Sequence, residues 1–171
     1  MDIVILIILV LLSAFFSATE TAFSGVNRIR LKSMAENGSR GAERALKILT
    51  KYDKALTTVL IGNNIVNIAT SSIATILAIK IVGEKYGSLV STIAVTLVVL
   101  VFGEVLPKSI AKDFAESFCV AVSGILSFLM AVFTPFSAFF IVLKKGISKL
   151  FRNKESVSVT EEELMAIIDD I

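Results

Sequence analysis

The chain has 171 residues, of which 55% are hydrophobic and 19% charged, with a formal net charge of +2 and a mean hydropathy of +0.84. A soluble domain with a water-facing surface is less apolar than this, so we expect an integral, all-α membrane protein. The chain contains no histidine. This removes the commonest ligand for zinc or copper and the commonest general base, so we expect any bound metal to be held by oxygen.

The first apolar block covers residues 3–25 and is long enough to cross a bilayer. It lacks the basic start and the small-residue cleavage site of a signal peptide, so it is predicted to stay as the first span. Residues 28–54 carry eight basic and three acidic side chains. The positive-inside rule places such a segment in the cytoplasm, here as interfacial helices with a turn at Asn37-Gly38, and it places the N-terminus outside.

Two more spans are predicted, at residues 55–79 and 89–106, joined by a short polar link at 80–88. The third span ends in Gly103-Glu104-Val105-Leu106-Pro107-Lys108. Because proline has no backbone N–H, we expect the helix to kink or break at Pro107 and to leave unpaired carbonyls near Gly103.

A fourth apolar stretch, residues 117–143, is long enough to cross the membrane. A crossing would put the basic side chains Lys144, Lys145, Lys149, Arg152 and Lys154 outside. The positive-inside rule disfavours that arrangement, so we interpret residues 113–151 as interfacial helices broken near Pro135, with the C-terminus cytoplasmic. A true fourth span stays open as the alternative.

Residues 156–171 contain Thr160 as a helix N-cap followed by acidic residues in the first turn. The sequence stops soon afterwards, at Ile171. We therefore expect this segment to be a linker helix into a further soluble module, with residues 1–155 forming the transmembrane domain.

Each predicted span carries a polar cluster. The candidate ion ligands in these clusters are Ser13 and Ser17 in the first span, Asn63, Asn64 and Asn67 in the second, and Gly103 and Glu104 in the third. Carboxylates at membrane depth are costly unless they face protein, water or a cation, which makes Glu104 and Glu20 functional candidates. Mg²⁺ prefers about six oxygen ligands, and these groups offer hydroxyl, amide, carboxylate and backbone oxygens.

Structural interpretations of the same residues stay open. Serine and asparagine in membrane helices also serve as interhelical hydrogen bonds. Glu20 could pair with Arg28, and Glu104 could pair with Lys108, four residues further along.

The chain resembles the transmembrane domain of the CorC/CNNM (cyclin M-type) family of magnesium transporters. The matching motifs are Ser13-Ala-Phe-Phe-Ser-Ala-Thr-Glu-Thr-Ala-Phe-Ser, Ile61-Gly-Asn-Asn-Ile-Val-Asn and Phe102-Gly-Glu-Val-Leu-Pro-Lys, together with Val159-Thr-Glu-Glu-Glu-Leu in the linker. The resemblance implies a homodimer of three-span subunits in the cell membrane that exports Mg²⁺ in exchange for Na⁺. It also implies cation ligands at Ser13, Ser17, Asn64, Asn67, Gly103 and Glu104, and an ATP-binding pair of cystathionine-β-synthase-type modules beyond this sequence.

Two rivals are weighed against a transporter. The first is a membrane scaffold or sensor whose polar clusters only stabilise the dimer. The second, an intramembrane enzyme, is disfavoured because the spans offer no nucleophile with a base beside it. The basic segment is interpreted as a lipid-facing surface with no nucleic-acid role.

Overall fold

The computed structural model describes residues 1–136, and every element in that part of the chain is helical, as predicted. In chain order the elements are α1 (Asp2–Gly25), α2 (Arg28–Glu36), α3 (Arg40–Leu49), α4 (Tyr52–Val82), α5 (Glu84–Val98), the π-helix η1 (Val99–Val105), α6 (Leu106–Asp113) and α7 (Ala115–Val132). The predicted linker at 156–171, and the part of the predicted interfacial region beyond residue 136, lie outside the described residues.

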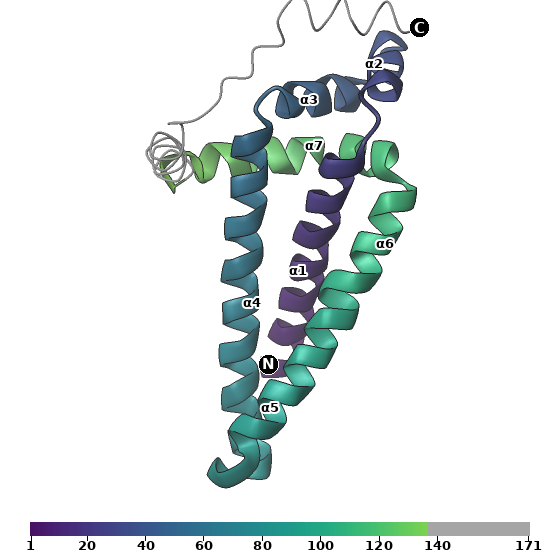
Figure 1. Ribbon diagram of the computed structural model, residues 1–171. Coiled ribbons are helices and arrows are strands. Elements are labelled where there is room, and N and C mark those ends of the chain that lie inside the picture. The colour runs from purple at the N-terminus through teal and green to yellow at the C-terminus, as the bar shows by residue number, and fades with distance from the viewer. Residues whose placement is uncertain (137–171) are drawn as a thin grey trace, which may run out of the picture.

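Three long helical rods form the body of the molecule (Figure 1). They are α1, α4 and the rod made of α5, η1 and α6, and α1 packs against both others. The N-terminus and the α4–α5 turn lie at one end, and α2 and α3 lie at the opposite end. The link predicted at 80–88 is a tight turn at Gly83, whose φ of +90° suits glycine, so α4 and the α5–α6 rod are longer than the predicted spans.

Of the kink or break predicted at Pro107, the break is wrong, because the helical rod continues through this residue. Residues 99–105 widen into a π-helix, in which the N–H of Leu106 donates to the carbonyl of Val101, and α6 then continues with proline in its first turn. A proline there is tolerated because the first turn of a helix needs no N–H donor. Pro107 has no N–H to donate to a carbonyl of the preceding turn, and the prediction of unpaired carbonyls near Gly103 stays a prediction.

The segment between α1 and α4 forms the predicted helix pair. Asn27 caps α2 through its side chain, Ser39 caps α3, and Gly38 takes a φ of +87° at the turn between them. The apolar sides of both helices are buried, with Leu31 and Ala42 fully covered. The basic side chains therefore collect on the outer surface of this end.

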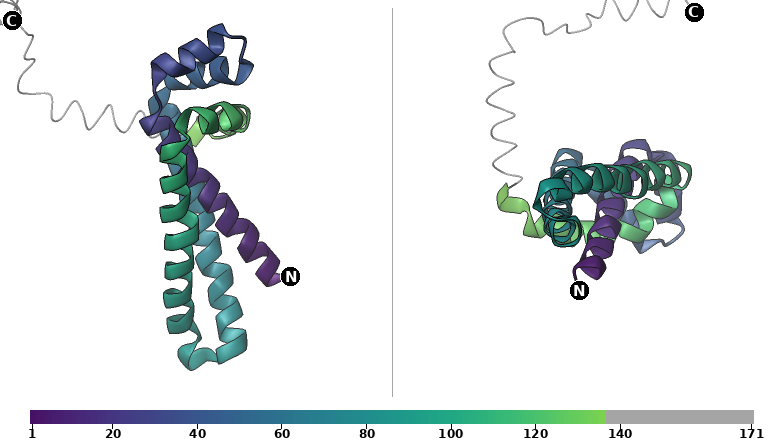
Figure 2. Two further views of the ribbon diagram at one scale, coloured as in Figure 1. Left: turned by 90° about the vertical axis from the view of Figure 1, so that its right-hand side faces the viewer. Right: turned by 90° about the horizontal axis from the view of Figure 1, so that it is seen from below.

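Helix α7 is apolar and long enough to cross a membrane, as are α1, α4 and the α5–α6 rod. It lies across the end of the bundle, below α2 and α3, rather than alongside the rods (Figures 1 and 2). Near its start Glu116 approaches Arg30 of α2 at 3.8 Å, and just beyond its end the Thr134 hydroxyl accepts a 2.9 Å hydrogen bond from Lys54. Both ends of α7 are thus tied to the same end of the molecule.

Candidate cation site

The three rods converge on Ser13, near the middle of α1. Its side chain is fully buried, and its Oγ lies 2.8 Å from Oδ1 of Asn67 and 3.2 Å from Oδ1 of Asn63, both on α4. Asn63 and Asn67 are one turn apart and therefore share a face of the helix. Three side-chain oxygens from two helices meet at this point, which we call the oxygen cluster (Ser13, Asn63 and Asn67).

The single hydroxyl of Ser13 faces two amide oxygens in the oxygen cluster. A serine hydroxyl has one hydrogen and can donate it to only one of the two amide oxygens at a time. The other amide oxygen faces Ser13 without receiving a proton from it. Such an arrangement favours a cation or a water molecule that completes the contacts.

Gly103 lets the third rod reach the cluster. A Cβ atom at this position would lie 3.0 Å from Ser13 Oγ and 3.3 Å from Ser13 Cβ, closer than side chains normally pack. Gly103 is buried within η1, and π-helical segments in α-helices are frequent at functional sites. The glycine and the π-helix together bring the backbone of the third rod close to the side chain of Ser13.

Ser17 lies one turn further along α1, on the same face as Ser13. It is fully buried, and its Oγ is the one buried side-chain oxygen or nitrogen in residues 1–136 without a hydrogen-bond partner. Buried hydroxyls elsewhere, such as those of Thr19 and Thr70, donate to the backbone carbonyl four residues before them. Ser17 does not, so its hydroxyl is free to serve as an ion ligand.

An ion pair lies beyond Ser17, toward the end of the bundle that carries α2. Glu20 of α1 pairs with Lys108 of α6 at 3.4 Å. Both alternatives weighed from the sequence are therefore wrong, because Glu20 does not pair with Arg28 and Lys108 does not pair with Glu104. The packing of α1 against η1 and α6 explains this pair. In two parallel helices that meet at Ser13 and Gly103, Glu20 and Lys108 lie at similar heights.

The remaining candidate residues are placed differently. Asn64 is exposed and lies outside the oxygen cluster, whereas Asn63 and Asn67 are partly buried within it. Glu104 is half-buried and forms no ion pair with any residue in 1–136. The described residues contain no group of three or more His, Cys, Asp or Glu side chains that could hold a metal. Any cation here must therefore rely mainly on hydroxyl, amide and backbone oxygens.

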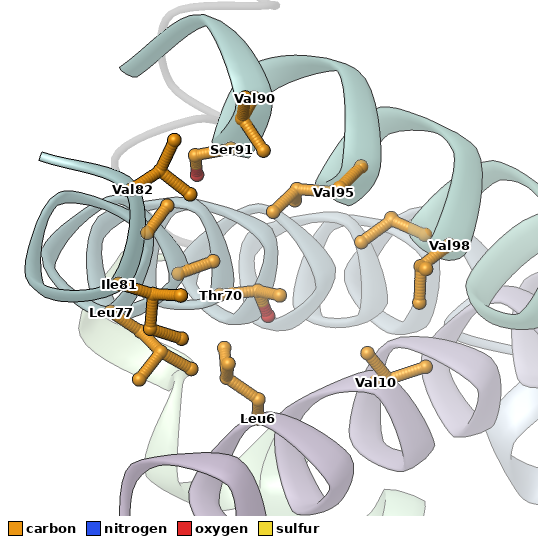
Figure 3. A pocket seen from close by; sticks show the side chains of 14 residues that line it. Leu6, Val10, Thr70, Leu77, Ile81, Val82, Val90, Ser91, Val95 and Val98 are labelled. Carbon is orange, nitrogen blue, oxygen red and sulfur yellow. The ribbon is translucent and has the colours of Figure 1, made fainter. Parts of the chain in front are cut away.

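An apolar cavity of about 370 Å³ begins about one helical turn from the oxygen cluster, on the side away from α2. It lies between α1, α4 and α5, where the N-terminal half of α1 leans away from the other rods (Figure 2). Its lining includes Val10, Thr70 and Val99, each about one turn from a residue of the cluster or from Gly103. Only Thr70 and Ser91 bring side-chain oxygen to this otherwise aliphatic lining (Figure 3).

Comparison with known proteins places these features in a wider group. The sequence profile of the family described as "Cyclin M transmembrane N-terminal domain" matches residues 4–170. The chain is 36% identical to a UPF0053 protein of Haemophilus influenzae over 98% of this chain and 40% of that protein. It is 38% identical to the UPF0053 inner membrane protein YfjD of Escherichia coli over 93% of this chain and 38% of that protein.

A further relative is the polyamine export protein of Haemophilus influenzae, 29% identical over 96% of this chain and 41% of that protein. The chain thus spans about two fifths of the length of these curated relatives. The family and its inner-membrane relative support a multi-pass membrane protein.

Proposed function

Since this chain belongs to the cyclin M transmembrane-domain family, we propose that it binds a partly dehydrated Mg²⁺ at the oxygen cluster and carries it across the membrane. Export, with Na⁺ moving in the opposite direction, is the direction that the family resemblance favours. No enzymatic role is proposed. The proposal concerns the transmembrane domain that the family profile matches over residues 4–170.

The observation that carries the proposal is the spacing of the oxygens around Ser13. Mg²⁺ binds oxygen at about 2.1 Å in octahedral order, so neighbouring ligands are about 3 Å apart. The Ser13 hydroxyl lies 2.8 and 3.2 Å from two amide oxygens, which suits adjacent positions on one ion. Ser17 and the carbonyls near Gly103 are further ligands of the same chemistry, and water completes the shell.

The proposed topology has three spans, α1, α4 and the α5–α6 rod, in each subunit of a homodimer. The ties of Glu116 to Arg30 and of Thr134 to Lys54 support an interfacial α7, because a crossing helix could not have both ends on one side. The basic residues of α2 and α3 put that side in the cytoplasm. The oxygen cluster then lies near mid-membrane, where transporters commonly bind their substrates.

The direct test is Mg²⁺ flux in proteoliposomes that contain the full-length protein, with and without a Na⁺ gradient. Ser13→Ala should abolish most of the flux, because it removes the atom on which the cluster converges. Unchanged flux in Ser13→Ala would contradict the assignment. If the variant loses its dimer and shows no ion effect, the scaffold alternative is favoured instead.

A second substrate class has its own observation in support. One relative is named a polyamine export protein, and the cavity of about 370 Å³ beside the oxygen cluster is aliphatic. A linear diamine could place one ammonium at the oxygens and its methylene chain in this cavity. Competition decides between the classes: 1,4-diaminobutane should not displace Mg²⁺ if the cluster is a magnesium site. The polyamine would be favoured if the diamine binds tightly, if Val10→Asn weakens this binding, and if Mg²⁺ does not affect it.

A further inference from the structure

The polar residues of α1 form a path that begins at the cytoplasmic end of the bundle as proposed above. Ser13, Ser17 and Glu20 recur at spacings of four and three residues and therefore share one face. They cover about 10 Å along the helix axis, since each residue adds 1.5 Å. The inner part of this path is the oxygen cluster, the middle is the unpartnered Ser17, and the outer part is the Glu20–Lys108 ion pair.

The outer part is more open to water than the inner part. The side chains of Glu20 and Lys108 are 27% and 40% exposed, whereas Ser13 and Ser17 are fully buried. A cation that moves along this face of α1 from the α2 end would meet Glu20 before it reaches Ser17. The carboxylate it meets is already engaged by the Lys108 ammonium at 3.4 Å.

We infer that the Glu20–Lys108 pair is a cation-operated gate, in which the Lys108 ammonium competes with the incoming ion for Glu20 and sets the preference for divalent over monovalent cations. This inference rests on the proposed function. Lys108 then acts as a specificity-determining residue without being an ion ligand itself.

The charge difference supplies the preference. At equal distance a divalent ion gains twice the Coulomb energy of an ammonium with the same carboxylate, whereas Na⁺ gains about the same as the ammonium it must displace. At equal distance, Coulomb attraction to Glu20 therefore favours displacement of the ammonium by Mg²⁺ over its displacement by Na⁺. Once displaced, the flexible Lys108 side chain can extend to the exposed end of α6, where the long stem of a lysine lies easily at an interface.

The chain offers a matched control in Lys112. It lies one turn after Lys108 on α6, is exposed, and forms no ion pair with any described residue. Lys108→Met and Lys112→Met each remove one positive charge from the same helix. Only the first releases a carboxylate.

The experiment measures Mg²⁺ binding to the full-length protein in nanodiscs by calorimetry, in choline and in Na⁺ buffers of equal ionic strength. Lys108→Met should tighten Mg²⁺ binding about tenfold in choline, about the effect of 1.4 kcal/mol, and should make binding sensitive to Na⁺. Lys112→Met should change neither property. In the Glu20→Gln background the effect of Lys108→Met should vanish, because no carboxylate remains to be released.

Equal effects of Lys108→Met and Lys112→Met on Mg²⁺ binding would overturn the gate, because the loss of one positive charge anywhere on α6 would then explain both. So would a gain from Lys108→Met that persists in the Glu20→Gln background. If Lys108→Met does not fold, Lys108→Gln tests the same release of charge. Ser13→Ala separates this inference from the proposed function. If Ser13→Ala leaves Mg²⁺ binding unchanged, the proposed site is wrong. If Ser13→Ala abolishes Mg²⁺ binding but Lys108→Met does not change it, only the gate is wrong.

Discussion

The Oγ atom of Ser13 lies 2.8 Å from Oδ1 of Asn67, and this contact joins two helices that are 54 residues apart in sequence at that point. This buried contact between an amide oxygen and a hydroxyl joins α1 to α4 through polar atoms. The remaining lone pairs of these oxygens are available to a bound ion. Ion binding and helix packing therefore depend on the same atoms.

The asparagine pair on α4 gives a sharp first prediction. Asn67→Ala should weaken Mg²⁺ binding about tenfold, the loss expected when one neutral ligand worth about 1.4 kcal/mol is removed. Asn64→Ala should leave binding unchanged, because Asn64 is exposed and lies outside the oxygen cluster. Calorimetric titration of both variants is the measurement. A stronger effect from Asn64→Ala would move the site to the other face of α4.

Gly103 supports a second prediction. Gly103→Ala puts a Cβ atom 3.0 Å from Ser13 Oγ, so η1 must move away from α1 or the serine must rotate. Overpacking of this kind costs about 1–3 kcal/mol, and Mg²⁺ binding should weaken together with thermal stability. Gly25→Ala is the matched control, since nothing lies within 4 Å of its added methyl group. Melting curves with and without Mg²⁺ compare the two. Unaltered Mg²⁺ protection in Gly103→Ala would count against the close approach of the third rod.

The sequence predicts the helical class and the residues of the cluster well, because both depend on local signals. Long apolar blocks require helices in lipid, and a polar residue inside such a block stands out. Asn67 shares a face with both Asn63 and Asn64 at helical spacing, so periodicity alone does not decide which of them meets Ser13. The packing of α4 against α1 decides it.

Two features depended on contacts that no local pattern encodes. Pro107 was expected to kink or break the rod, but the helix continues from the seven residues of η1 into α6. Glu20 was expected to pair with Arg28 if it paired at all, since Arg28 is close in sequence. Its partner Lys108 lies 88 positions away, and only the parallel packing of α1 and α6 brings the two together.

A third prediction concerns the contact between α3 and α7. A Cβ atom at Gly41 would lie 2.6 Å from Cγ1 and 2.8 Å from the backbone oxygen of Val120, so Gly41→Ala should push α7 away. Cys119, the only cysteine of the chain, is fully buried beside this contact and reports the change. Maleimide labelling of Cys119 should rise several-fold in Gly41→Ala. Gly124→Ala is the control, because its methyl group would meet only the flexible end of Arg44, at 3.6 Å.

The last prediction decides the topology of α7. In a Cys119→Ser background, Thr134→Cys and Arg30→Cys should react with a membrane-impermeant maleimide from the same side of the membrane. Thr134 lies just beyond the end of α7 and is bonded to Lys54, and Glu116 lies near the start of α7 and is paired with Arg30. Lys85→Cys, beyond the α4–α5 turn, should react from the opposite side. In right-side-out and inside-out vesicles, residues 30 and 134 should therefore be labelled from one side and residue 85 from the other. Labelling of Thr134→Cys together with Lys85→Cys would make α7 a fourth span, and the basic residues beyond it would then have to lie outside, against the positive-inside rule.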